Sequence, residues 1–564
     1  MNRFGVFAIR DGGLATNMSR GTNSDSVLAL DKRIEEMTAE LIQLKRSRNS
    51  FLSIARISPE VLGYIFRLSV IPGAADGDFA GLRKDPRTLL LVSHHWSEVA
   101  RRTPELWSFW GNSLEDWKRQ YPRSGTFPLD LVLDGLKHQD RSFDGDLQEA
   151  LSDYATRDTI RKVHLRGGDA QLLTNIVSTL TPEEDGTRDS SIESIVLEGV
   201  GTVRSLARRG KVRTNCVDAS GFLSRHHFLK LQDLTLSGRF TISSEAWACL
   251  KSHTTALVNL SLAFDPPLSF LTTSQIVLLL ASNPNIRNLT LALPKIDDSG
   301  SGSGSRVPLH HLENLFLRGE PHRAFQILRQ LELPERVDRT KLVFSDHTPD
   351  EVREAIVPQI RDYLHRDPRS KDRLGISVWV KNHRFFLRAS VVGVGYHGPD
   401  RLPQRDAPHM TFITTIWPRP AEVEKFYIDI LALLPRESIV YFQTDLPMTV
   451  TKEVIVAMPN LEALYLVNAE VSDGFMLPSP DGPNEHTDLL PSLQRLYLHD
   501  AHAKSDDWNP LVRYVTHQNS GDHPFSLNLY GDSAKIRPGL VEQIEGLVEE
   551  FVCGPGPRLD RPLL

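Results

Sequence analysis

The sequence predicts an α/β fold in which an N-terminal helical module is followed by an α/β solenoid. Three observations predict it: a helical period of apolar residues near the N-terminus, two further helices with apolar faces, of which the second contains Trp96, and a strand pattern that recurs along the remaining chain. The chain has 564 residues, of which 40% are hydrophobic and 24% charged, as in ordinary globular domains. At about 150 residues per domain, this length indicates several domains or one long repeat array.

The N-terminal region divides into two segments. Residues 1–24 are rich in Gly, Ser and Asn and are predicted to be disordered. Residues 25–53 form an amphipathic helix whose apolar residues alternate in steps of four and three, namely Leu30, Ile34, Met37, Leu41, Leu44 and Phe51, with Arg48 interrupting the seam. This helix is either a dimerising coiled coil or a helix that folds back on its own protein. We favour the second, because about three heptads is near the lower limit for a coiled coil.

Residues 54–112 contain the next helices. Ser58 is a suitable N-cap and Pro59 suits the first helical position. A polar insertion follows, and a second helix is predicted over Thr88–Arg102. It ends at Thr103, because the residue before Pro104 is excluded from the α conformation.

The ordered residues of this segment resemble the F-box, in the form common in large fungal families. The matching residues are Pro59-Glu60-Val61-Leu62, Ile65-Phe66, Val92-Ser93, Trp96, Val99-Ala100 and Thr103-Pro104-Glu105-Leu106-Trp107. Ile57-Ser58 stand where that family usually has Leu-Pro. The resemblance implies a three-helix module that docks on the Skp-type adaptor of a Skp–cullin–F-box ubiquitin ligase.

A segment of about fifty residues cannot bury all of its large apolar side chains within itself. Some of them must meet a neighbour, and buried aromatic residues are the usual anchors of such contacts. The expected adaptor-binding residues are Ile57, Pro59, Leu62, Ile65, Phe66, Val92, Trp96, Leu106 and Trp107. Among them, Trp96 is expected in the module core, and Pro59, Leu62 and Ile65 at the interface.

A Leu-x-x-Leu-x-Leu strand pattern recurs within residues 125–552. Its copies are Ile160–Gly167, Ile192–Gly199, Leu231–Gly238, Leu257–Phe264, Ile286–Leu293, Leu312–Gly319, Leu461–Asn468 and Leu493–Asp500. Four successive copies begin 26 to 29 residues apart, which is leucine-rich-repeat spacing. Helices are predicted between them over Thr272–Ser282 and Arg323–Leu331. One unit cannot bury its face alone, so stacked units should form the solenoid, with residues such as Arg161, His164 and Thr235 facing a target.

Residues 345–455 are irregular and are either diverged repeats or an insertion. They are predicted to contain a helix over Pro349–Arg366 and strands over Ile376–Val380 and Phe385–Val394. Residues 297–305 are a Gly- and Ser-rich linker in composition. The Pro- and Gly-rich tail, residues 553–564, is expected to be frayed.

Composition and motifs argue against several functions. A net charge of −6 disfavours nucleic-acid binding, and no run of about 18 apolar residues predicts a membrane span. Three scattered cysteines and no secretory signal pattern favour the cytoplasm or nucleus. Gly393–Gly398 matches G-x-G-x-x-G, but Pro399 follows where a helix would have to begin. Catalytic residues, metal ligands and cofactors are therefore not expected.

The expected function is that of a substrate receptor, which binds an adaptor through the helical module and an unknown target protein through the repeats. Such a chain does no bond chemistry itself; it raises the concentration of target lysines near the ligase. One alternative is a leucine-rich-repeat scaffold that does not bind the adaptor. A further alternative is an enzyme whose site lies in residues 345–455.

Overall fold

The computed structural model divides the chain into two compact units, Met1–Pro128 and Leu129–Leu564. Apart from a few isolated positions, the structure describes residues 21–70, 86–110, 121–134, 159–167, 170–181, 188–199, 216–264, 271–293, 306–334, 337–347, 374–381, 384–391, 410–416, 434–472, 490–503, 507–519, 525–531 and 538–554. Outside these residues lie the predicted linker at 297–305, the predicted helix Pro349–Arg366, the Gly393–Gly398 motif, and most of the predicted disordered ends. At those ends, a helix already begins at Gly21 and a strand continues to Gly554.

The first unit is mainly helical. Its elements are α1 (Gly21–Ser50), η1 (Ser53–Arg56), α2 (Pro59–Val70), α4 (Arg87–Leu90), α5 (His94–Arg101), η3 (Pro104–Leu106) and the short strand β1 (Phe109–Trp110). The predicted start of α2 is confirmed, since the Val61 amide donates to Ser58 Oγ at 3.4 Å. The predicted helix Thr88–Arg102 is instead divided at Ser93. That residue is extended and accepts a hydrogen bond from the Trp96 amide at 3.2 Å, so it caps α5.

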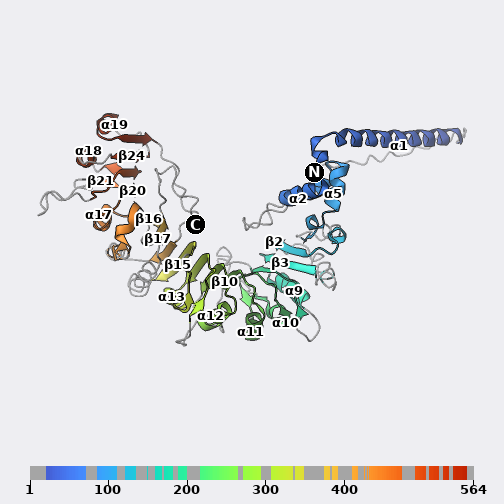
Figure 1. Ribbon diagram of the computed structural model, residues 1–564, viewed down its shortest axis with the longest axis horizontal. Helices are drawn as coiled ribbons and strands as arrows, with labels where there is room; N and C mark the ends of the chain where they lie inside the picture. The colour runs from blue at the N-terminus through green and yellow to red at the C-terminus, as the bar shows by residue number, and fades with distance from the viewer. Residues whose placement is uncertain are drawn as a thin grey trace, which may run out of the picture. The chain divides into compact units, whose positions relative to one another are not determined.

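The second unit contains a large, mostly parallel sheet (Figure 1). Its strands are β2 (Leu129–Asp134), β3 (Ile160–Arg166), β5 (Ser194–Glu198), β8 (Asp233–Gly238), β10 (Asn259–Phe264), β11 (Asn288–Leu293), β13 (Asn314–Gly319), β15 (Arg339–His347), β16 (Leu374–Lys381), β17 (Arg384–Val391), β18 (Met410–Ile416), β19 (Ile439–Thr444), β20 (Ala463–Val467), β22 (Arg495–His499), β24 (Ser526–Tyr530) and β25 (Glu550–Gly554). Each predicted copy of the strand pattern lies on one of these strands. The predicted α/β fold class is therefore confirmed.

Register explains why the strand pattern builds this sheet. Leu260 of β10 pairs with Leu234 of β8 and Leu289 of β11, and all three side chains are buried. Neighbouring strands thus stack their leucines in rows on one face, where apolar surface leaves water. Gly238 ends β8 at a φ of 102°, and a Cβ there would lie 2.9 Å from the Gly199 carbonyl oxygen. Glycine is required at this close approach.

Helices cover the leucine face of the sheet in its first half (Figure 1). They are α9 (Ala170–Leu180), α10 (Ser220–Arg225), α11 (Ser244–His253), α12 (Thr273–Ala281) and α13 (Pro321–Gln330). The second half has α17 (Met448–Ile455), α18 (Asn509–Asn519), α19 (Pro538–Glu545) and the short η8 (Arg436–Ser438). The two helices predicted between strands are confirmed as α12 and α13.

Short parallel strand pairs add to this unit beside the large sheet. They are β4 (Arg188–Asp189) with β7 (His226–His227), β6 (Val217–Asp218) with β9 (Phe240–Thr241), β12 (Val307–Pro308) with β14 (Leu331–Glu332), and β21 (Glu470–Val471) with β23 (His502–Ala503). Each pair joins segments that flank successive strands of the large sheet. These contacts therefore hold neighbouring strand–helix segments of the second unit together away from the main sheet.

The irregular region supplies the strands at the middle of the sheet. β15 pairs in parallel with β18, β18 pairs antiparallel with β17, β17 pairs antiparallel with β16, and β16 pairs in parallel with β19. The sheet order is therefore β15-β18-β17-β16-β19, and the chain reverses twice before the parallel order resumes. The predicted strands at Ile376–Val380 and Phe385–Val394 are confirmed as β16 and β17, and of the two readings the sheet order favours an insertion.

Candidate protein-interaction surface

One face of α2 builds the core of the helical unit. Leu62, Phe66 and Val70 are buried there. They pack in one cluster with Leu89, Val99, Ala100, Leu106 and Trp107. The rings of Phe66 and Trp96 have centroids 4.8 Å apart. Gly63 lets α2 approach the end of α5, since a Cβ there would lie 3.1 Å from Thr103 Oγ1.

Trp107 anchors this core from the far end. Its side chain is 1% exposed, and its Nε1 donates to the Ala100 carbonyl at 2.7 Å. The guanidinium carbon of Arg123 lies 4.9 Å from the centre of the same ring system. A buried indole whose single donor is satisfied combines large apolar burial with a fixed orientation. Trp107 therefore holds η3 against the end of α5.

The opposite face of α2 is apolar and open to solvent. Val61, Tyr64, Ile65 and Leu68 follow the i, i+3, i+4, i+7 spacing of one helical face, and their exposed fractions run from 42% to 62%. Leu91 and Val92, between α4 and α5, are also exposed. α2 is thus apolar on two faces, and its own unit buries only one of them. Contiguous exposed apolar side chains of this kind mark interaction sites. We call Val61, Tyr64, Ile65 and Leu68 the α2 stripe.

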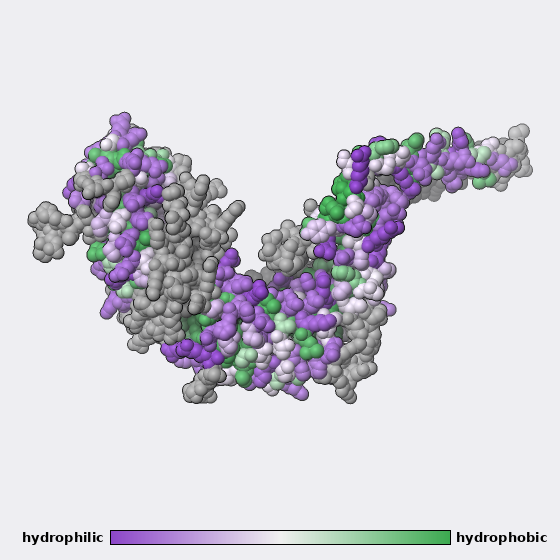
Figure 2. Space-filling model, in the orientation of Figure 1, coloured by the Kyte–Doolittle hydropathy of each residue, from purple (hydrophilic) through white to green (hydrophobic). Residues whose placement is uncertain are grey.

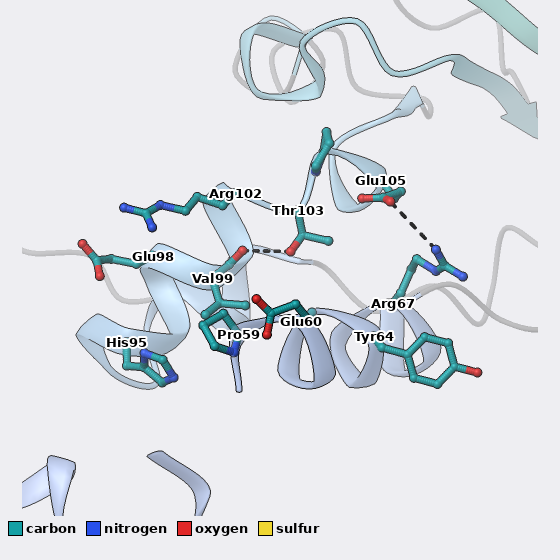
Figure 3. Close-up of a pocket in the computed structure, with 12 residues that line it drawn as sticks. Pro59, Glu60, Tyr64, Arg67, His95, Glu98, Val99, Arg102, Thr103 and Glu105 are labelled. Atoms are coloured by element: carbon teal, nitrogen blue, oxygen red, sulfur yellow. Dashed lines mark hydrogen bonds and ion pairs between the residues drawn. The ribbon is translucent and has the colours of Figure 1, made fainter. Parts of the chain in front are cut away.

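A polar groove adjoins the α2 stripe (Figure 3). It encloses about 630 Å³ between α2, α5 and η3. Arg67 Nη1 and Glu105 Oε1 lie 3.8 Å apart across it, and Thr103 Oγ1 donates to the Val99 carbonyl at 2.8 Å. Hydrogen bonds from its own backbone amide and from Ser58 lower the pKa of Glu60. Both carboxylates and guanidinium groups line the groove, so it offers polar contacts of both signs beside an apolar stripe.

The residues predicted to bind an adaptor divide between the core and the surface. Pro59, Ile65 and Val92 are exposed and available to a partner. Ile57 and Trp96 are half-buried against the core, and Trp96 agrees with its expected place there. Four others, Leu62, Phe66, Leu106 and Trp107, are at most 1% exposed. This corrects the expectation that they face a partner: their side chains complete the unit's own core and support the surface from beneath.

Sequence reasoning missed Val61, Tyr64, Leu68 and Leu91. The available signal was the second helical stripe on α2, offset by one residue from the first. Because both stripes are apolar, spacing alone does not tell which one the unit buries. The choice is made by Leu89, Val99 and Leu106, which come from segments far along the chain.

A second surface lies on the sheet face opposite the leucine rows. At its first strands, Arg161 donates to both carboxylate oxygens of Asp130 at 3.0 and 3.1 Å. Thr235 is half-buried and pairs in register with Ser261, which pairs with Thr290. At the other end of this row, Arg318, Arg339 and Lys341 are exposed, and the Lys341 ammonium lies 5.4 Å from the centre of the Phe316 ring.

The strand starts on this surface are joined by side-chain amides. Asn259 donates to Asp233, Asn288 to Asn259, and Asn314 to Asn288. The ladder satisfies polar groups at the beginnings of four neighbouring strands. It therefore fixes their register as well as their spacing. Of the three residues expected to face a target, Thr235 alone is neither ion-paired nor buried.

His164 on this surface is predicted to make stability depend on pH. It is 7% exposed, its Nε2 lies 2.9 Å from Ser194 Oγ, and burial followed by the charges of Lys162 and Arg166 lowers its pKa to about 4. The unfolded chain binds this proton near pH 6.5, so stability is full above that pH and falls as pH decreases toward 4. We expect about 3 kcal/mol of loss between pH 7 and pH 4.

The measurement is the free energy of unfolding of the full chain by chemical denaturation at both pH values. His164→Gln keeps a hydrogen-bonding side chain and cannot take up the proton. If wild type and His164→Gln lose stability in parallel between pH 7 and pH 4, the assignment to His164 is wrong.

No group of three or more His, Cys, Asp or Glu residues within the described ranges could hold a metal ion. None of the described helices has the length and apolar character that crossing a bilayer requires.

No protein-family model matches this chain. No curated protein matches it either.

Proposed function

We propose that this chain is the substrate receptor of a Skp–cullin–F-box ubiquitin ligase. Residues 54–112 act as the F-box-like module, and residues 125–552 form a leucine-rich-repeat solenoid that binds the target. The observation that carries the proposal is the α2 stripe, an exposed apolar helix face within the segment that resembles the F-box. Full burial of each of these side chains by a partner would contribute roughly 1.5–3 kcal/mol, which is not gained while they stay in water.

The adaptor contact follows from the chemistry of the two adjoining surfaces. The α2 stripe, with Pro59 and Val92 exposed in the same unit, supplies an apolar centre. The groove charges, including Arg67 and Glu105, supply a polar rim. Protein interfaces are commonly built in this way, with apolar residues at the centre and polar residues around them. We propose that the adaptor covers the stripe with a complementary apolar groove and pairs with the charges beside it.

The solenoid proposal rests on register. Leucines of successive strands pair from β8 to β13, and the corresponding sequence copies are 26 to 29 residues apart. Parallel strands at this spacing, with helices between them, are what leucine-rich repeats require. Stacked units of this type present a long surface to other proteins.

The target is proposed to dock on the sheet face opposite the leucine rows. Arg318 and Arg339 are exposed there, and among the described residues no carboxylate pairs with either of them. Lys341 adds a third positive charge beside the Phe316 ring. These charges complement an acidic segment of the target, and the ring offers an apolar contact within it. The receptor then acts by bringing target lysines close to the ligase, in the cytoplasm or nucleus, and catalyses no step itself.

Capture of a Skp-type adaptor tests the proposal. The purified full chain is mixed with recombinant adaptor, and the product is analysed by size-exclusion chromatography with light scattering. We expect one adaptor to co-elute with each chain. An unchanged mass at micromolar concentrations with excess adaptor would overturn the receptor function and support a scaffold that does not bind the adaptor.

A further inference from the structure

The helix α1 carries an apolar seam that the described part of its own unit leaves exposed. Its residues from Asp25 to Arg48 are all exposed, and Figure 2 shows apolar side chains among hydrophilic ones along its length. The seam residues have exposed fractions from 51% to 63% and are Val27, Leu30, Ile34, Met37, Leu41 and Leu44. Among the residues of the first unit that the structure describes, none covers the seam, so these residues do not show the expected folding back of the helix.

The spacing of the seam identifies the kind of surface that fits it. Val27, Ile34 and Leu41 are seven residues apart, and Leu30, Met37 and Leu44 follow each of them by three. They occupy the a and d positions of consecutive heptads, the pattern of a coiled coil. An a/d seam fits another helix with the same period. β-Branched residues at a with Leu at d favour two parallel strands, and Val27, Ile34, Leu30 and Leu44 meet that preference.

The flanking charges favour a second copy of the same helix. With Val27 at a, Glu40 occupies a g position and Lys45 the following e position. In a parallel, in-register pair, each g residue faces the e residue five positions later on the other helix. Glu40 of each copy then faces Lys45 of the other, which gives two attractive pairs by symmetry. The other g residues of α1 are Ser26, Arg33 and Ser47. None of them faces a like charge, because the two serines are uncharged and Arg33 faces Thr38.

We propose that α1 pairs with α1 of a second copy of this chain as a parallel, two-stranded coiled coil. The proposal does not depend on the adaptor, because it uses neither the α2 stripe nor the sheet. Pairing buries the seam of both copies and needs no rearrangement of α2 or α5. It makes the protein a dimer whose helical units are joined through α1.

The first test compares two substitutions at neighbouring positions. Leu41→Asp places a carboxylate in the seam, whereas Ile42→Asp makes a similar change at an exposed position outside it. Both lower helix propensity by the same kind of effect, so they differ only in the seam. By sedimentation equilibrium of the full chain, we expect wild type and Ile42→Asp to be dimers, and the dimer dissociation constant of Leu41→Asp to rise more than about 100-fold.

The second test uses charge exchange to establish the parallel register. Glu40→Lys and Lys45→Glu each turn two attractive pairs into repulsive ones, and each should weaken the dimer about five- to tenfold. Mixing the two variants recreates attractive pairs in the heterodimer, so tight association should return. A monomeric wild type at tens of micromolar, a dimer that Leu41→Asp leaves intact, or a mixture no tighter than its components would each overturn the proposal.

Discussion

Replacing both Ile65 and Leu68 on the α2 stripe with Asp is expected to abolish adaptor capture while leaving the helical unit folded. Both side chains are exposed, so the carboxylates remain in water in the free protein. At the proposed interface they would lose that water without gaining a partner. Truncation of a central apolar anchor commonly costs about 2 kcal/mol or more, or about 30-fold in affinity. Isothermal titration with the purified adaptor should therefore detect no binding.

Leu229→Asp together with Leu278→Asp is the matched control. These leucines are also exposed, but they belong to the second unit. We expect this control to bind the adaptor as wild type does, and both double variants to keep the wild-type melting temperature. Undiminished binding by the Ile65 and Leu68 variant would mean that the adaptor docks elsewhere or not at all.

Trp107→Ala is expected to destabilise the helical unit by about 3–5 kcal/mol. The substitution removes the largest buried side chain of this core, the hydrogen bond to the Ala100 carbonyl, and the ring beneath Arg123. Neighbours from α2 and α5 cannot refill that volume without breaking their own packing. The measurement is differential scanning calorimetry of the full chain, in which the transition of the first unit should shift to lower temperature or disappear.

Trp107→Phe separates the two contributions. It retains an aromatic ring in the core and removes the Nε1 donor. The Ala100 carbonyl keeps the hydrogen bond from the Thr103 amide at 3.3 Å, so the loss of one hydrogen bond should cost about 0.5–1.5 kcal/mol. The order of stability should be wild type, then Trp107→Phe, then Trp107→Ala. An unshifted calorimetric transition in Trp107→Ala would contradict the assignment of this residue as the anchor of the core.

Much of the fold could be predicted from local patterns in the sequence. Ser58 and Pro59 predicted the start of α2, and alternating leucines predicted the strands, because these signals depend on residues a few positions apart. Ser93 divides a predicted helix because its side chain caps α5, a competition between two local signals. The buried side of α2 was not predictable. The buried side is the one that packs against Val99, Leu106 and Trp107, and only folding brings these residues close to α2.

The order of β16, β17 and β18 lay equally beyond sequence reasoning. Their existence follows from local apolar runs, but their places depend on β18 returning to β15 and β16 accepting β19. Such pairings join residues far apart in the chain, and no local signal specifies them.

The double reversal at β17 has a consequence for how this gene product tolerates change in length. Since β18 and β16 both run in the direction of β15, β15 and β19 also share one direction. Removal of β16, β17 and β18 would leave the edges of β15 and β19 unpaired. Because these two strands run in the same direction, they could then pair with each other in parallel. An insertion with an even number of chain reversals therefore preserves the direction of every later strand, whereas one with an odd number would invert β19 to β25.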